Sequence, residues 1–216
     1  MLVSLLVGVD LLLMDQRAWT VVPAVVAALL LVLLARAVAL DAGDLGLRYD
    51  RLTSGVRLGG VLSGLVVLGY VVAIRVPFMA PAFDDDRTPD DLVSVLAKIL
   101  LVIPLRTVLL EELAFRGVLW GWLARVRGER TATWGSALAF GLWHVPPALV
   151  VVEANDALTI SSTGGATLVV GSIVVGTTAA GVLFAELRRR TRSLAAPAVL
   201  HWTVNSAGTL ASYLLR

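Results

Sequence analysis

Long apolar stretches separated by short charged segments make up most of this chain. Six of them are long and apolar enough to cross a bilayer: Trp19–Leu40, Arg57–Phe78, Leu92–Ala124, Ala132–Val151, Ala166–Leu187 and Ala195–Leu214. A backbone in lipid must satisfy its hydrogen bonds within the segment, so we expect these stretches to be helical. The pattern predicts an all-α fold, a polytopic transmembrane helical bundle with six spans.

Two apolar stretches are irregular. Met1–Met14 is short and contains Asp10, so it is consistent with a seventh span, a re-entrant segment or an interfacial helix. Leu92–Ala124 would be about 50 Å long as a straight helix, more than a perpendicular crossing requires. We expect it to tilt, or to bend near Pro104, whose nitrogen carries no hydrogen to donate.

Composition supports a membrane protein and excludes several functions. Of the 216 residues, 58% are hydrophobic and 16% charged, whereas soluble domains have about 25% charged residues. The length fits one compact bundle. The chain has no cysteine, which excludes disulfides, a thiol nucleophile and a cysteine-based zinc site. The basic residues form no stripe, so no nucleic-acid partner is expected, and the sequence does not indicate an oligomeric state.

The arginines predict the orientation of the bundle. Three loops are rich in arginine: Arg48, Arg51 and Arg57; Arg125, Arg127 and Arg130; Arg188, Arg189, Arg190 and Arg192. Because cytoplasmic loops carry an excess of basic residues, we expect these loops to be cytoplasmic. Lys98 is the only lysine, a bias typical of GC-rich bacterial genomes, so we expect a bacterial plasma membrane protein.

Glycines in the second span predict close helix packing. Gly55 and Gly59 are four residues apart, and so are Gly60 and Gly64. Small residues at this spacing allow the backbones of two membrane helices to approach closely. We therefore expect both pairs to contact a neighbouring helix.

Ionisable and polar side chains within the spans are the candidates for function. Glu111, Glu112 and Arg116 lie in V-L-L-E-E-L-A-F-R, and the only two histidines, His144 and His201, also fall in apolar segments. A charged group in hydrocarbon costs on the order of 3 kcal/mol, so such residues normally face a partner or a cavity. The set is consistent with a site inside the membrane.

Helix geometry sorts these residues. Glu112 and Arg116 are four positions apart and can pair, whereas Glu111 points roughly 100° away and is expected to face a cavity unpaired. His201 and Asn205 share a helix face, and Phe140 is placed to pack beneath His144. Measured from the cytoplasmic helix ends, Glu111, His144, Asn205 and His201 lie at about 20, 18, 15 and 9 Å. We therefore expect them to converge on one pocket.

Such groups could hydrolyse a peptide bond in two ways. A carboxylate and an imidazole can activate a water, while a second imidazole and an amide N–H stabilise the oxyanion. Alternatively, Glu111, His144 and His201 could bind zinc and leave one position for water. The shallower depth of His201, and the poor affinity of asparagine for zinc, favour a site without a tightly bound metal.

Three motifs in order, E-E-L-A-F-R at Glu111–Arg116, F-G-L-W-H at Phe140–His144 and H-W-T-V-N at His201–Asn205, resemble those of the CPBP family. This family contains CAAX proteases and bacteriocin-processing (Abi) membrane proteins, and D-L-G-L-R at Asp44–Arg48 is similar to a loop found upstream in it. The resemblance covers roughly residues 99–208. It implies residues 1–98 as an N-terminal transmembrane region and 99–216 as the catalytic membrane core.

By the resemblance, Glu111 and His144 would activate water, and His201 and Asn205 would form the oxyanion site. Glu112 and Arg116 would complete the first motif. The substrate would be a membrane-associated peptide or protein, and both metal-dependent and glutamate-dependent mechanisms have been described for the family. Two other functions remain open from the residues: a proton-coupled transporter, and a catalytically silent scaffold that regulates a partner.

Overall fold

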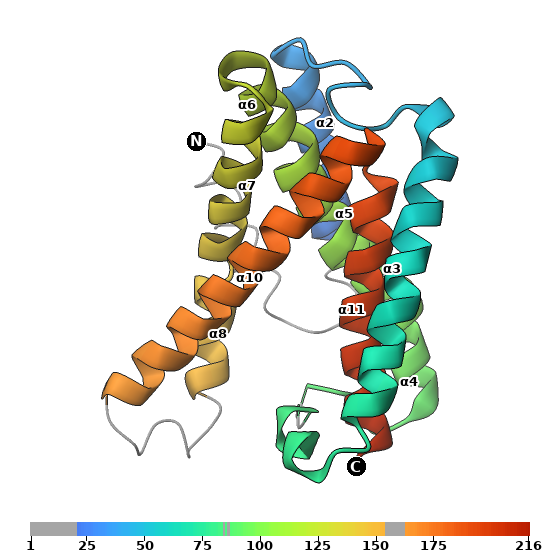
Figure 1. Cartoon of the computed structure of the whole chain (residues 1–216), viewed down its shortest axis with the longest axis vertical. Coiled ribbons are helices and arrows are strands. Elements are labelled where there is room, and N and C mark those ends of the chain that lie inside the picture. Colours follow the sequence, from blue (N-terminus) through green and yellow to red (C-terminus); the bar gives the residue numbers. More distant parts are fainter. Residues whose placement is uncertain (1–20, 84, 86, 154–162) are drawn as a thin grey trace.

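The computed structural model describes residues 21–83, 85, 87–153 and 163–216, so the predictions for Met1–Met14 lie outside the described residues (Figure 1). Every element of the described part is helical, which confirms the all-α prediction. The elements are α2 (Val21–Ala37), η2 (Tyr49–Arg51), α3 (Leu52–Ala73), η3 (Pro77–Phe83), α4 (Leu92–Ala97), η4 (Lys98–Val108), α5 (Leu109–Glu111), η5 (Glu112–Leu119), α6 (Trp120–Arg127), α7 (Glu129–Trp143), α8 (Val145–Glu153), α10 (Thr163–Thr191) and α11 (Ala195–Leu214).

Three helices of the described part are long and apolar enough to cross a membrane: Tyr49–Ala73, Leu92–Arg127 and Gly164–Thr191. The apolar helix α2 is shorter, at 17 residues. Helices do occupy the described parts of all six predicted spans, but the count of six crossings is not confirmed.

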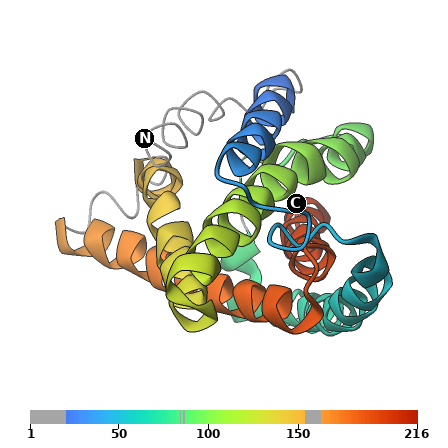
Figure 2. The same cartoon turned by 90° about the horizontal axis from the view of Figure 1, so that it is seen from above.

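The long segment Leu92–Arg127 runs obliquely across the bundle, from α4 at one end to α6 at the other (Figures 1 and 2). It contains two stretches of wide π-type turns, Lys98–Val108 and Glu112–Leu119. The first includes Pro104, and the Leu109 N–H donates to the Pro104 carbonyl, five residues back. The helix is thus irregular around Pro104, near which a bend was one of the two expected alternatives, and the second π-type stretch begins directly at Glu112. Such turns are rare and often occur at functional sites.

The predicted span Ala132–Val151 is interrupted at His144. Helix α7 ends at Trp143 and α8 begins at Val145, with His144 between them at φ −85° and ψ 2°. Pro146 and Pro147 follow, and neither nitrogen can donate to a carbonyl of the preceding turn. The expectation of one uninterrupted helix was therefore wrong here, and the break places His144 at a junction rather than on a regular helix face.

Helix α3 packs along α11 (Figure 1). Gly55 and Gly59 make this contact possible, because a Cβ on Gly59 would lie 2.7 Å from the Ala196 carbonyl oxygen. A Cβ on Gly60 or Gly64 would meet no atom of the described chain within 4 Å. The packing prediction is confirmed for the first pair of glycines and wrong for the second, which lies on another face of α3.

The D-L-G-L-R loop, Asp44–Arg48, is held at the arginine-rich end of the bundle. Nη2 of Arg188 donates to the carbonyls of Gly43 and Asp44, at 2.9 Å each. Arg125 donates to the Ala39 carbonyl at 2.6 Å and forms an ion pair with Asp44. Gly46 adopts φ +72°, where a side chain would be strained and would also meet Arg188. The loop is thereby fixed against α6 and α10.

Candidate active site

Glu112 is the centre of a buried polar cluster. Its Oε1 accepts a hydrogen bond from Arg116 Nη1 at 3.2 Å, which confirms the predicted pairing within the helix. The same oxygen lies 2.8 Å from Nδ1 of His201 on α11. Glu112 and Arg116 are 2% and 0% exposed. The last helix is thus joined to the first motif through one carboxylate oxygen.

Arg116 is enclosed by aromatic rings. Its guanidinium carbon lies 4.0 Å from the ring centroid of Phe140 and 5.0 Å from that of Phe184. Nε and Nη2 find no hydrogen-bond partner among the described residues. The faces of aromatic rings attract cations, so this enclosure offsets part of the cost of burying the charge.

His201 lies between the two glutamates. Its Nδ1 contacts Glu112, and its Nε2 lies 3.7 Å from Oε2 of Glu111. The ring stacks on Phe184 at a centroid distance of 5.1 Å. When Nδ1 donates to the Glu112 carboxylate, a neutral His201 presents a lone pair at Nε2, and only the imidazolium form presents an Nε2–H donor.

Glu111 is not unpaired, contrary to the sequence-based expectation. Trp143 Nε1 donates to Glu111 Oε1 at 3.3 Å, and His201 approaches the other oxygen. The expectation took each residue of a regular helix in isolation and did not include the indole N–H of Trp143. The position of Trp143 directly before His144 was the available signal. Through Trp143, the glutamate is connected to the junction that carries His144.

His144 is fixed by its own helix. Its Nδ1 donates to the Phe140 carbonyl at 2.8 Å, and the two rings pack edge to face at a centroid distance of 4.6 Å, as the spacing predicted. With Nδ1 as donor, a neutral His144 keeps Nε2 as an acceptor. The sequence order F-G-L-W-H thus places a positioned proton acceptor at the break between α7 and α8.

A polar cavity of about 410 Å³ adjoins this junction and is lined by His144 and Asn205, together with Tyr70, Lys98 and Thr209. Glu111 and His201 are not among its lining residues. The structure therefore brings the six candidate residues into two neighbouring groups. Glu111, Glu112, Arg116 and His201 form the buried cluster, while His144 and Asn205 face the cavity.

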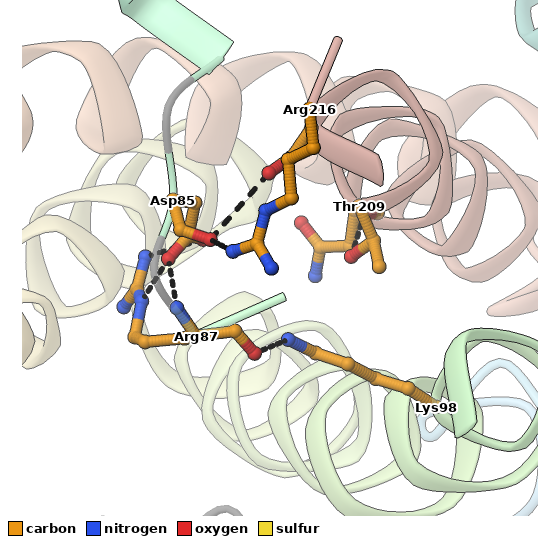
Figure 3. Close-up of polar contacts among 7 residues, drawn as sticks. Asp85, Arg87, Lys98, Thr209 and Arg216 are labelled. Atoms are coloured by element: carbon orange, nitrogen blue, oxygen red, sulfur yellow. Dashed lines mark hydrogen bonds and ion pairs between the residues drawn. The ribbon is translucent and has the colours of Figure 1, made fainter. Parts of the chain in front are cut away.

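Asp85 and Arg87, which precede α4, also line this cavity, and Figure 3 shows their polar contacts. Arg87 donates to the Asp85 carboxylate at 2.7 and 3.0 Å. Arg216 donates to the Asp85 carbonyl at 2.7 Å. Lys98 donates to the Arg87 carbonyl at 2.9 Å. Burial raises the pKa of Asp85, but the hydrogen bonds from Arg87 outweigh it and leave the pKa lowered. No sequence pattern predicted that these residues lie near the site.

The residues do not form a ready metal site. Among the described residues, no group of three or more His, Asp or Glu side chains is placed to hold a metal ion. His201 uses Nδ1 for Glu112, and its Nε2 lies 3.7 Å from Oε2 of Glu111. Glu111, His144 and His201 are thus not gathered as a ligand set in the described arrangement, and metal dependence stays a prediction to be measured.

Comparison with known families gives one match. A family model described as Rce1-like, type II CAAX prenyl endopeptidase Rce1-like, matches residues 93–207, a range that includes all six candidate residues. No curated protein and no solved structure matches the chain.

Proposed function

Because the chain belongs to the Rce1-like family of type II CAAX prenyl endopeptidases, we propose that it is an integral membrane endopeptidase whose site lies within the helical bundle. Its substrate is a membrane-associated peptide or protein. The observation that most supports the proposal is the cluster of Glu111, Glu112 and His201 beside a polar cavity lined by His144 and Asn205. These side chains come from three different parts of the chain.

We assign water activation to Glu111 and His144. The Glu111 carboxylate is oriented by the Trp143 indole, and His144 offers Nε2 because its Nδ1 is used by Phe140. A carboxylate and a neutral imidazole can both accept a proton from water as its oxygen attacks the substrate carbonyl. The proton is then returned to the leaving nitrogen, so hydrolysis ends with a free carboxylate, a free amine and the original site.

Asn205 and His201 are assigned to the oxyanion. The Asn205 amide lines the cavity and can donate N–H to a developing negative charge. His201 can donate through Nε2 only as the imidazolium, because Nδ1 already faces Glu112.

Glu112 and Arg116 are proposed to position the catalytic residues. Glu112 sets the ring of His201 through Nδ1, and Arg116 compensates the charge of Glu112. Neither has to contact the substrate for this role. Their replacement is therefore expected to reduce both the stability of the fold and the rate.

The test is peptide cleavage by the purified full-length chain in detergent. A prenylated peptide with a C-terminal CAAX sequence and an unmodified membrane-associated peptide are incubated separately, and new termini are identified by mass spectrometry. Cleavage that is lost in Glu111→Gln supports the proposal. A correctly folded chain that cleaves neither peptide would favour the regulatory scaffold over an endopeptidase. Parallel reactions with a chelator, together with the measured metal content, test metal dependence.

A further inference from the structure

A second polar cavity lies at the arginine-rich end of the bundle, away from the polar cavity at His144 and Asn205. Its volume is about 390 Å³, and six arginines line it: Arg48, Arg51, Arg125, Arg188, Arg189 and Arg192. Three acidic residues also line it, Asp41, Asp44 and Glu129, which leaves an excess of three positive charges. We call this space the arginine cavity.

The acidic residues of the arginine cavity already have hydrogen-bond or ion-pair partners. Asp44 forms an ion pair with Arg125, and Asp41 and Asp44 accept hydrogen bonds from each other's backbone N–H. Glu129 lies 3.7 Å from Arg189. Asp50, outside the cavity lining, accepts two hydrogen bonds from Arg48 at 2.9 Å and lies 3.4 Å from Arg51. The positive charges of Arg188 and Arg192 therefore exceed what the carboxylates around the cavity compensate.

Arg188 supplies a buried donor in the wall of the arginine cavity. It is 2% exposed, its Nη2 holds the backbone of the D-L-G-L-R loop, and its plane lies over Trp120 at 4.9 Å from the ring centroid. Its Nε finds no hydrogen-bond partner among the described residues. Burying a cation is costly, and an anion bound in the cavity would compensate the charge of Arg188.

A large apolar cavity adjoins the arginine cavity, and Arg48 lines both. The apolar cavity has a volume of about 500 Å³ and is lined by Val25, Leu29 and Val32 of α2 and by Leu109 of the long segment. Arg48, Tyr49, Glu112 and Ser193 are the polar side chains in its described lining, and the rest of the lining is apolar or glycine. An anion bound beside Arg48 would thus have hydrocarbon-lined space next to it.

We infer that the arginine cavity binds the phosphate of an anionic phospholipid, with an acyl chain of the same lipid in the apolar cavity. Phosphate oxygens match the bidentate donor pattern of guanidinium groups, and basic pockets between membrane helices bind lipid headgroups. The shared lining at Arg48 favours a lipid over free phosphate, because only a lipid fills both spaces. The inference does not depend on the endopeptidase activity.

The test measures lipid binding by native mass spectrometry of the purified full-length chain in detergent, with phosphatidylglycerol, phosphatidylcholine and inorganic phosphate as probes. The variant Arg51→Gln/Arg192→Gln removes two lining charges while leaving Arg125 and Arg188 to hold the loop. Arg127→Gln/Arg130→Gln is the matched control, because these arginines lie at the same end but do not line the cavity. One arginine near a lipid surface contributes about fivefold in affinity, so the double variant is expected to bind phosphatidylglycerol about five- to thirtyfold more weakly.

Three outcomes would overturn the inference. The first is equal loss of phosphatidylglycerol in the cavity variant and in the control. The second is phosphatidylcholine binding as tightly as phosphatidylglycerol, which would leave no role for the positive charge. The third is inorganic phosphate binding as tightly as phosphatidylglycerol, because that would assign the cavity to a free anion. Thermal unfolding of both double variants without added lipid checks that each is folded.

Discussion

Nδ1 of His201 lies 2.8 Å from Oε1 of Glu112, although the two residues are 89 positions apart in the chain. The same carboxylate oxygen accepts from Arg116. The side chains of Arg116, Glu112 and His201 therefore form one buried series of contacts, which continues to Glu111 through His201 Nε2. Loss of the central carboxylate should affect both the fold and the imidazole.

We predict that Glu112→Gln lowers the melting temperature and the yield as well as the activity. The change leaves Arg116 as an uncompensated buried charge, at a cost of about 3–5 kcal/mol. Thermal unfolding in detergent measures the effect. Glu129→Gln is the control, since its ion pair with Arg189 is exposed and worth about 0–1 kcal/mol. Equal stability of the two variants would contradict the structural role of Glu112.

Asn205→Ala should reduce turnover with little change in stability. Removal of one oxyanion donor typically costs about 10²–10³ in kcat. Steady-state cleavage kinetics measure this loss, with Ser206→Ala as the neighbouring control because Ser206 lines a different, apolar cavity. Full activity of Asn205→Ala would refute the oxyanion assignment and leave a packing role.

Trp143→Phe tests the connection between Glu111 and the His144 junction. The variant loses the indole N–H that binds Glu111 but keeps an aromatic ring against Phe115. A hydrogen bond to a charged group is worth about 1.5–3 kcal/mol, so at least a tenfold loss of kcat/KM is expected. Trp134→Phe, at a 59% exposed tryptophan, is the control. If both variants retain full activity, the indole does not orient the carboxylate.

Gly59→Ala and Gly60→Ala should have different effects on stability. At Gly59 the new methyl group meets the Ala196 carbonyl, and overpacking of this kind costs about 1–3 kcal/mol. At Gly60 it meets no atom of the described residues within 4 Å, and alanine favours a helix over glycine by about 0.5–1 kcal/mol. The melting temperature should therefore fall only for Gly59→Ala. An equal change in both would contradict the observed packing of α3 on α11.

The sequence predicted the helical class and the pairing within one helix better than the contacts between helices. The spacing of Glu112 and Arg116 was sufficient for their pairing, because it depends only on one helix. The contact of His201 with Glu112 depends on how α11 is rotated against a π-type segment, which no local pattern specifies. The glycine pairs illustrate the same limit, since spacing does not tell which face of α3 meets α11.

The break at His144 could have been predicted from the sequence, because Pro146 and Pro147 follow within three residues and their nitrogens cannot donate to the preceding turn. Apolar length alone suggested a continuous span. The hydrogen bonds that hold the D-L-G-L-R loop could not be predicted from the sequence. They come from Arg125 and Arg188, whose arginine-rich loops indicated topology only. Charge clusters in a sequence do not reveal which carbonyls they will bind.

The central claim is that Glu111 activates the attacking water. Its most direct test is single-turnover cleavage of the best-cleaved peptide by wild-type protein and by Glu111→Gln, each normalised to folded, purified chain in the same detergent. The amide keeps the shape of the side chain and can still contact Trp143 through its oxygen, but it cannot accept a proton from water at neutral pH. The account predicts rapid cleavage by the wild type and background cleavage by a stable Glu111→Gln. A Glu111→Gln variant that retains more than about a tenth of the wild-type rate would contradict it, because loss of a general base typically costs about 10²–10⁴.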